Sequence, residues 1–310
     1  MLFVDQLNRS VEISFPPRKI ISLVPSQTEL LCDLGLEDQL IAVTKFCVHP
    51  THIRKSKQII GGTKNLRIEE IKILNPDLII ANKEENDQKQ IETLANFFPV
   101  WISDIKNFDG ALDMIYKVGE ITDKKNQSQK IIDQILEAKT NFQKLLRSPQ
   151  FAIQNSHLPA KAQFTESWLA GFAIPTLYLI WKDPYMTVGG DTFISNMLEM
   201  AGFKNIFQHL KRYPELSTLN LPADASRTCC GQAGPQPGTL NSEPLTQNPQ
   251  LIFLSSEPYP FKEKHIQDLQ TIFPQSKIIL VDGEMFSWYG SRMLYCFDYF
   301  LNLHTAFNEL

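Results

Sequence analysis

The sequence predicts an α/β fold of two similar lobes, each with a mostly parallel sheet, joined by a long linker helix. Short apolar runs alternate with amphipathic segments along the chain, which is typical of such sheets. A pattern of Asn-Pro, one polar residue and four apolar residues occurs twice, at Asn75–Ala81 and Asn248–Leu254. Its apolar runs do not alternate, which favours parallel strands buried on both faces. A length of 310 residues, 43% of them hydrophobic, fits about two domains.

The first predicted lobe spans residues 1–110. A hairpin within residues 1–18 leads to a strand at Ile20–Val24. Ser26 and Glu29 have the spacing of a capping box and predict a helix that ends at Gly35. The remaining elements expected in this lobe are strands at Leu40–Val43, Leu78–Ala81 and Val100–Ser103, with helices at Glu69–Leu74 and Gln88–Phe97.

Residues 111–147 form the predicted linker region. Apolar residues recur every three or four positions in Lys125–Leu146, a helix of about 30 Å. The pattern fits either an ordinary amphipathic surface helix or a strut between the lobes.

Because the residue before a proline avoids the α region, Asn75 in the first lobe and Asn248 in the second should each end a helix.

The second predicted lobe, residues 148–310, repeats the first. Thr28–Gly35 aligns with Ser195–Gly202 without a gap. The expected elements are strands at Leu177–Trp181, Leu251–Leu254 and Lys277–Val281, a helix at Lys264–Phe273 and a closing helix from about Gly290. An irregular loop at about 219–244, rich in Pro and Gly, replaces the helix that the symmetry requires. We interpret it as a local divergence of the second copy.

Several classes of function are disfavoured. A net charge of −4 gives no reason to expect nucleic acid or an anionic membrane surface as a partner. The five cysteines have neither metal-ligand spacing nor a disulfide framework, and His49 and His52 lack a third ligand nearby. Motifs such as G-x-S-x-G, Walker A, G-x-G-x-x-G and H-E-x-x-H are missing, so no enzyme, metal or cofactor is expected. The N-terminus lacks the apolar region of a signal peptide.

Ligands of α/β sheets bind beyond the carboxyl ends of the strands, and two facing lobes would place two such edges across one cleft. The first-lobe candidates are Pro25, Ser26, Gln27, Lys45, Phe46 and Cys47. The second-lobe candidates are Trp181, Met186, Gly189, Gly190, Asp191, Ser287, Trp288 and Tyr289.

Two groups among these candidates suggest a particular kind of contact with a ligand. The segment Gly189–Thr192 either offers free N–H groups to an anionic or amide oxygen or is a plain turn. Phe46, Trp288 and Tyr289 either stack on a flat ligand or belong to the core.

Five segments carry a resemblance to a known family: Ile20–Glu29, Val43–Pro50, Leu74–Leu78, Thr187–Asp191 and Phe286–Tyr289. They resemble class III periplasmic binding proteins, the helical-backbone receptors of ABC importers for cobalamin, ferric siderophores and haem, and lean toward the cobalamin-binding branch. The resemblance implies that the aromatic residues at the positions of Phe46 and Trp288 contact the corrin. It also implies that Glu69 or Glu70, with Glu243 in the second lobe, docks on arginines of the permease.

The expected function is therefore that of a monomeric solute-binding protein. It would hold a cobalamin-like ligand in the interlobe cleft and pass it to an ABC importer. A ferric siderophore or haem is the alternative ligand, favoured respectively by cleft arginines or lysines and by a His or Tyr ligand. A cytoplasmic corrinoid-handling enzyme or sensor is the alternative of another class. The family is exported but no leader is evident, so the location stays open between periplasm and cytoplasm.

Overall fold

The computed structural model describes residues 1–148, 173–216 and 249–309. Their contacts divide them into two compact units, one within Met1–Ser156 and Trp288–Leu310 and the other within His157–Ser287. Each unit contains a parallel sheet and helices, which confirms the predicted α/β fold of two lobes. The first unit is discontinuous in sequence, because its last part follows the whole of the second unit.

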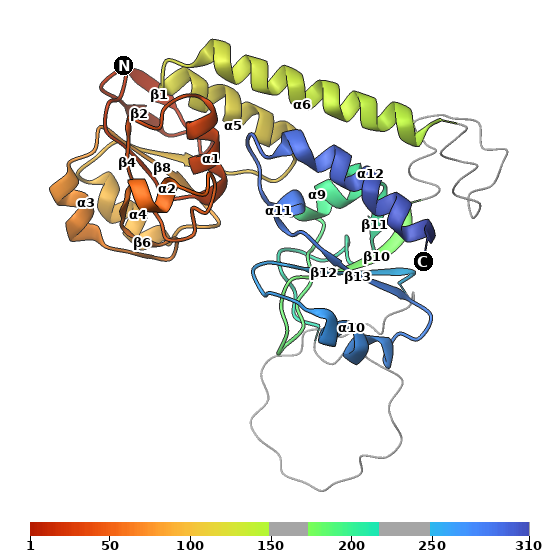
Figure 1. Cartoon of the computed structure of the whole chain (residues 1–310). Helices are drawn as coiled ribbons and strands as arrows, with labels where there is room; N and C mark the ends of the chain where they lie inside the picture. Colours follow the sequence, from red (N-terminus) through yellow and green to blue (C-terminus); the bar gives the residue numbers. More distant parts are fainter. Residues whose placement is uncertain (149–172, 217–248, 310) are drawn as a thin grey trace, which may run out of the picture. The chain divides into compact units, whose positions relative to one another are not determined.

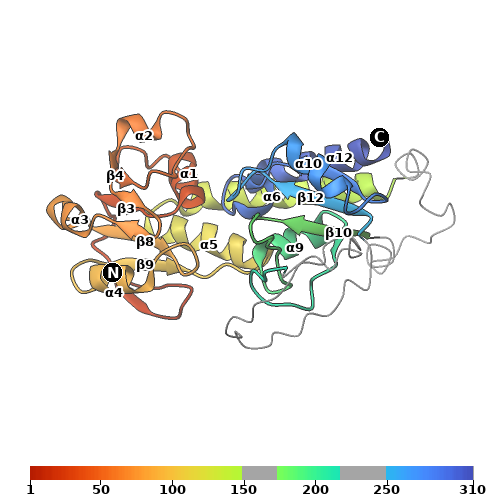
Figure 2. The ribbon, with the colours of Figure 1, turned by 90° about the horizontal axis from the view of Figure 1, so that it is seen from below.

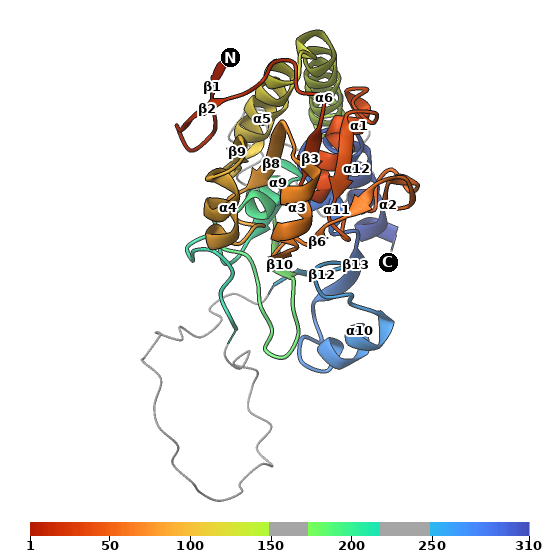
Figure 3. The same ribbon diagram turned by 90° about the vertical axis from the view of Figure 1, so that its left-hand side faces the viewer.

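The sheet of the first unit has the strand order β5-β4-β3-β8-β9, and all of its neighbours are parallel. The strands are β3 (Ile20–Ser22), β4 (Leu40–Val43), β5 (Gln58–Ile59), β8 (Leu78–Asn82) and β9 (Val100–Ser103). Every residue of β3, β8 and β9 is buried, as expected for parallel strands covered on both faces. A hairpin of β1 (Leu2–Val4) and β2 (Ser10–Glu12) adjoins β9, where the N–H of Gln6 donates to the carbonyl of Ile102 (Figure 3).

Seven helices complete the described part of this unit. Four are short and follow strands: α1 (Pro25–Asp33), α2 (Ile53–Ser56), α3 (Ile68–Leu74) and α4 (Gln88–Ala95). Three longer ones pack together, with α6 (Lys125–Leu146) against both α5 (Phe108–Ile121) and α12 (Met293–Glu309). Phe142 of α6 lies 5.7 Å and 6.3 Å, between ring centroids, from Phe297 and Phe300 of α12. In the parts of the chain that the structure describes, no helix is both long and apolar enough to cross a membrane.

The second unit has the parallel strand order β11-β10-β12-β13. Its strands are β10 (Ile174–Leu179), β11 (Phe203–Asn205), β12 (Leu251–Ser255) and β13 (Lys277–Val281), and its described helices are α9 (Phe193–Met200), α10 (Glu263–Gln270) and α11 (Glu284–Ser287). Helices α9 and α10 cover opposite faces of this sheet (Figures 1 and 2).

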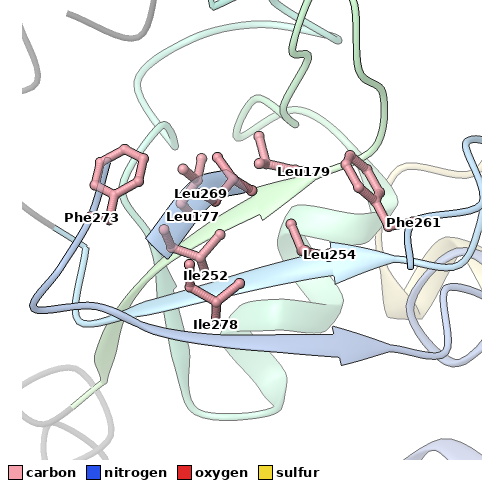
Figure 4. Close-up of a cluster of buried hydrophobic side chains, with 8 residues drawn as sticks. All are labelled: Leu177, Leu179, Ile252, Leu254, Phe261, Leu269, Phe273 and Ile278. Carbon is pink, nitrogen blue, oxygen red and sulfur yellow. The ribbon is translucent and has the colours of Figure 1, made fainter. Parts of the chain in front are cut away.

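Both faces of the second sheet are packed. On one face, apolar side chains of the strands meet those of α10 and its flanking loops in a cluster of Leu177, Leu179, Ile252, Leu254, Phe261, Leu269, Phe273 and Ile278 (Figure 4). On the other face, Tyr178 and Phe253 pack edge-on or tilted against Phe286 of α11. This two-sided burial explains why the Leu251–Leu254 run is apolar without alternation.

The predicted internal repeat is visible in the topology. In chain order, the strands β3, β4, β8 and β9 lie in the spatial order second-first-third-fourth, and β10, β11, β12 and β13 lie in the same order. The helix after the first strand of each unit is followed by a glycine with positive φ, +74° at Gly35 and +84° at Gly202. A left-handed residue there allows the chain to leave the helix, and glycine adopts it without a steric cost.

Two expectations about the elements are wrong. No capping box forms at Ser26, because α1 begins at Pro25 after Val24 and has no side-chain cap. The strand expected at Leu177–Trp181 is Ile174–Leu179. The region 111–147 holds most of two helices, since α5 spans Phe108–Ile121. The expectation that Asn75 ends a helix is confirmed: it is the C-cap of α3, with φ of 49°. Asn248 and the loop 219–244 lie outside the described residues.

Candidate functional site

The candidate residues of the first unit lie at the carboxyl ends of its strands. Gln27, on the first turn of α1, is fully buried and its Nε2 donates to Ser103 Oγ at the end of β9 (2.5 Å). Asn82 Nδ2 donates to the same hydroxyl (3.0 Å) from the end of β8. Pro25 and Ser26 are also buried. The side chain of Gln27 therefore ties α1 to the sheet and has no surface that a ligand could reach.

Lys45, Phe46 and Cys47 follow β4 and face different surroundings. The Phe46 ring is 48% exposed, and the Lys45 ammonium lies 5.0 Å from its centroid. A Cβ on Gly62 would come within 3.1 Å of this ring, so the glycine allows the ring to lie against the β6–β7 hairpin (Gly61–Gly62 and Asn65–Leu66). The Phe46 ring therefore packs against the β6–β7 hairpin on one side and is exposed elsewhere.

Cys47 is fully buried between two hydroxyls, with its Sγ 3.0 Å from Thr28 Oγ1 and 3.3 Å from Thr44 Oγ1. Burial raises the pKa of this thiol, so it is protonated at neutral pH. A protonated, inaccessible thiol is neither a nucleophile nor a metal ligand. Its position favours a packing role.

Trp288 belongs by its contacts to the first unit, although the sequence predicts it in the second lobe. The indole is 8% exposed and meets two side chains of the same unit. His49, in the loop after β4, lies edge-on at 5.4 Å between ring centroids. The Arg292 guanidinium carbon lies 5.1 Å from the indole centroid. A ligand that stacks on Trp288 must therefore use the ring surface that Arg292 does not cover.

Tyr289 is also buried, and its hydroxyl donates to Glu85 Oε1 at 2.7 Å. Burial, with the adjacent negative charge of Glu85, raises the pKa of Tyr289 well above its usual value. The phenol is therefore neutral over the physiological range and serves as a hydrogen-bond donor. Glu85 is itself placed by Asn82, whose Oδ1 accepts from the backbone N–H groups of Glu84 (2.8 Å) and Glu85 (3.1 Å).

Sequence reasoning missed the two carboxylates that hold the segment Trp288–Arg292. Glu29 of α1 accepts a bidentate pair of hydrogen bonds from Arg292, at 2.8 Å and 2.7 Å. Glu85 accepts from Tyr289. Glu29 and Arg292 are 263 positions apart in the chain. Because Glu29 also has the capping-box spacing to Ser26, the sequence suggests a local role for Glu29 and gives no sign of its contact with Arg292.

The candidates of the second unit fall into two groups at the carboxyl edge of its sheet. Trp181 follows β10, is 40% exposed and meets Tyr259 edge-on at 5.6 Å between ring centroids. Met186 forms isolated bridges with Trp181 and Glu215. Tyr259, which the sequence does not single out, follows β12 and therefore adds a second aromatic ring to this edge.

Of the two alternatives for Gly189–Thr192, the hydrogen bonds at Gly189 and Gly190 agree with the plain turn and not with free N–H groups. The N–H of Gly189 donates to the carbonyl of Arg212 (2.7 Å), and that of Gly190 donates to the carbonyl of Leu210 (2.9 Å). Asp191 Oδ1 accepts from the N–H of Arg212 at 2.5 Å. A Cβ on either glycine would clash with the backbone of residues 208–211, so the glycines serve this close approach. The segment is a packed turn that leads into α9, whose N-cap is Thr192 with a side chain that accepts from Ser195 N.

Ser287 and the docking candidates complete the predicted set. Ser287 Oγ donates to Glu257 Oε1 within the second unit. The Glu69 side chain is 80% exposed and pairs with Lys72 at 2.8 Å, whereas Glu70 is less exposed and pairs with Arg67 at 3.3 Å. Glu243 lies outside the described residues. Of the described pair, Glu69 is the more accessible to a partner.

Among the described residues, metal-ligating side chains do not come together at either edge. Within residues 1–148, 173–216 and 249–309, no three His, Cys, Asp or Glu side chains are placed to hold one ion. His52 Nε2 lies 2.9 Å from Glu37 Oε1, whereas His49 contacts Trp288. The two histidines of the H-x-x-H segment thus have separate partners.

Comparisons with known proteins agree with this architecture. A family model described as periplasmic binding protein matches residues 20–270. The vitamin B12-binding protein of Pectobacterium carotovorum subsp. carotovorum (strain PC1) is 25% identical over 282 residues, which cover 90% of this chain and 85% of that protein. Alignments to other curated relatives cover between 59% and 70% of their length.

Solved structures share the fold. The periplasmic vitamin B12 binding protein BtuF of Vibrio cholerae superposes with a TM-score of 0.66 at 18% identity, covering 95% of this chain and 98% of that one. Staphylococcus aureus SirA, complexed with staphyloferrin B, gives a TM-score of 0.66 at 16% identity, covering 99% and 98%. The two structures thus share one fold, although one is named for vitamin B12 and the other is complexed with staphyloferrin B.

Proposed function

The chain belongs to the periplasmic binding protein family, and from this membership we propose that it binds a cobalamin-like corrinoid and delivers it to the permease of an ABC importer. Members of this family bind solutes, which agrees with the expectation of a protein that is not an enzyme. The observation that carries the choice of ligand is the alignment to a vitamin B12-binding protein over 90% of this chain.

The aromatic residues at the carboxyl edge of the first unit favour a large, flat ligand. Phe46 presents a half-exposed ring that is backed by Gly62, and Trp288 lies in the same unit beside His49. Aromatic rings bury much apolar area at a low cost in conformational entropy, because they have few rotatable bonds. Trp181 would add a further ring from the second unit. That the two edges share one ligand stays a prediction.

A ferric siderophore is the second candidate, since a structure of the same fold is complexed with staphyloferrin B. Anionic siderophores require cationic side chains at the site. Arg292 is the cation that contacts the candidate Trp288, and its charge is neutralised by a bidentate pair with Glu29. This arrangement disfavours an anionic chelate at Trp288, whereas the Lys45 ammonium beside Phe46 is a cation that such a chelate could use. The choice of a corrinoid therefore rests on the alignment.

The proposal is tested by calorimetric titration of the purified chain with cyanocobalamin, haem and a ferric siderophore. We expect saturable binding of cyanocobalamin, and loss of the Trp288 ring in Trp288→Ala should weaken it about tenfold without unfolding the protein. Circular dichroism of the variant checks the fold. Binding of haem or siderophore in place of cyanocobalamin would change the ligand, and binding of none would reopen the enzyme or sensor alternative.

The same proposal includes a docking surface for the permease, centred on Glu69. Its carboxylate is the most exposed of the described candidates and lies on α3. A partner arginine would compete with Lys72 for this carboxylate, and its planar, bidentate geometry favours it over an ammonium. Glu243 remains a proposed counterpart in the second lobe.

A further inference from the structure

The segment Trp288–Arg292 directly precedes α12, and two carboxylates bind it to the rest of the first unit. Glu85 accepts from the Tyr289 hydroxyl at 2.7 Å. Glu29 accepts from Nε and Nη2 of Arg292 at 2.8 Å and 2.7 Å. Between these contacts, Gly290 has φ of +94°, a conformation that lets Tyr289 and Arg292 reach different partners.

The Glu29–Arg292 pair is largely withdrawn from water, since the two side chains are 13% and 10% exposed. A bidentate guanidinium–carboxylate pair fixes the plane of the guanidinium as well as its position. The same guanidinium lies 5.1 Å from the indole centroid of Trp288. The orientation of Glu29 is therefore transmitted to the indole through a planar group that contacts both.

We propose that Glu29 is a positioning residue for ligand binding: acting through Arg292, it holds the Trp288 ring in the orientation that receives the ligand. The inference rests on the proposed function, in which Trp288 stacks on a corrinoid. Because the pair is electrically balanced, Arg292 supports the ring without demanding an anionic ligand. A ring that is already held in place loses less freedom when the ligand binds, which raises affinity.

The first test needs no ligand. The chain contains four tryptophans, so labelling with 5-fluorotryptophan should yield a small set of fluorine NMR signals, of which Trp288→Phe identifies one. In Glu29→Gln we expect the Trp288 signal to shift or broaden while those of Trp101 and Trp181 stay in place. An unchanged Trp288 signal in the folded variant would overturn the positioning role.

Two further variants keep this test decisive. Glu29→Gln leaves a buried guanidinium without its partner and could fail to fold, whereas Glu29→Leu combined with Arg292→Met removes both charges, a replacement that buried pairs often tolerate. This double variant should also alter the Trp288 signal. Arg9→Gln is the matched control, because it removes another ion pair of the first unit, to the buried Asp5 at 2.7 Å. It should leave the Trp288 signal unchanged.

The second test separates positioning from a general loss of stability. Affinity for cyanocobalamin is measured for Glu29→Gln in the native background and in Trp288→Ala. Positioning predicts a loss of about tenfold in the native background and less than about twofold when Trp288 is absent, since contacting residues are energetically coupled. Equal losses in both backgrounds would overturn the route through Trp288. If the native chain binds no cyanocobalamin, the proposed ligand is wrong, while the fluorine signals still decide whether Glu29 positions Trp288.

Discussion

Single polar side chains, many of them buried, determine how the loops at the two carboxyl edges are held. In the first unit, Asn86 Nδ2 reaches the carbonyls of Leu23 (3.3 Å) and Thr63 (3.1 Å) and so joins separate loops. In the second unit, His265 has the comparable task at the start of α10. It is 2% exposed, and its Nδ1 accepts from the N–H of Lys262 at 2.8 Å. The Asn86 amide does not titrate, whereas His265 can accept this hydrogen bond only while its Nδ1 is unprotonated.

His265 should make stability depend on pH. Its pKa is lowered from 6.5, first by burial and then by the charges of Lys182 and Lys264. A lowered folded-state pKa means that the unfolded chain takes up the proton first as pH falls. The stabilising contribution is therefore present above about pH 6.5 and is lost as pH falls toward the folded-state pKa.

Urea unfolding of the native chain and of His265→Gln at about pH 7.5 and about pH 5.5 measures this contribution. As the pH is lowered, the free energy of unfolding should decrease less in His265→Gln than in the native chain. Equal slopes for native and His265→Gln proteins would contradict the assignment.

At the scale of elements, several boundaries follow from the sequence because local chemistry sets them. The strands Leu40–Val43, Val100–Ser103 and Lys277–Val281 and the helix Lys125–Leu146 match their predicted ranges. Helix α5 was missed because Gly110 and Gly119 lower its helix propensity. The structure explains Gly119: a Cβ there would lie 2.1 Å from Ser128 Oγ of α6, so only glycine permits this approach of the two helices.

Helix α12 shows which residues of an element carry its stability. Phe300 is fully buried and packs on Phe142, whereas Tyr295 on the same helix is 60% exposed. Phe300→Ala should lower the free energy of unfolding of the first unit by about 3–5 kcal/mol, through lost burial and a cavity. Tyr295→Ala should change it by less than about 0.5 kcal/mol. Urea titration monitored by circular dichroism compares the two, and similar losses would contradict the packing described for α12.

The candidate site was less predictable than the fold, for a physical reason. Positions at strand ends can be read from local patterns, so Phe46 could be predicted to follow a strand, whereas Trp288, predicted in the second lobe, belongs to the first unit. Burial and partners depend on contacts between distant segments, so neither the burial of Gln27 nor the Glu29–Arg292 pair could be read from the sequence. The glycines at 189 and 190 were placed correctly at a turn, but their N–H groups are taken by carbonyls about 20 residues further along the chain.

At the scale of the whole molecule, a solute-binding protein must bind its ligand and its permease through separate surfaces. Glu69 on α3 should affect only the second of these. Glu69→Lys should weaken binding to the cognate permease, reconstituted in lipid vesicles, about tenfold by placing like charges opposite one another. The calorimetric affinity for cyanocobalamin should stay unchanged.

Glu92→Lys provides the matched control for this experiment. Glu92 is an exposed carboxylate on α4 of the same unit, and its Oε1 accepts from Gln88 Nε2 at 2.7 Å. Its charge reversal should leave permease binding as in the native chain. Equal effects of the two substitutions would indicate a general charge effect and argue against a docking surface centred on Glu69.

The discontinuity of the first unit has a consequence for biosynthesis. Its sheet is encoded within the first 103 residues, but Phe297 and Phe300, which cover Phe142, are translated only after the entire second unit. While the ribosome traverses that stretch, the apolar faces of α5 and α6 lack their permanent cover. The nascent first unit should therefore be a chaperone client until the ribosome has passed α12, whereas the second unit, continuous in sequence, can close its core earlier.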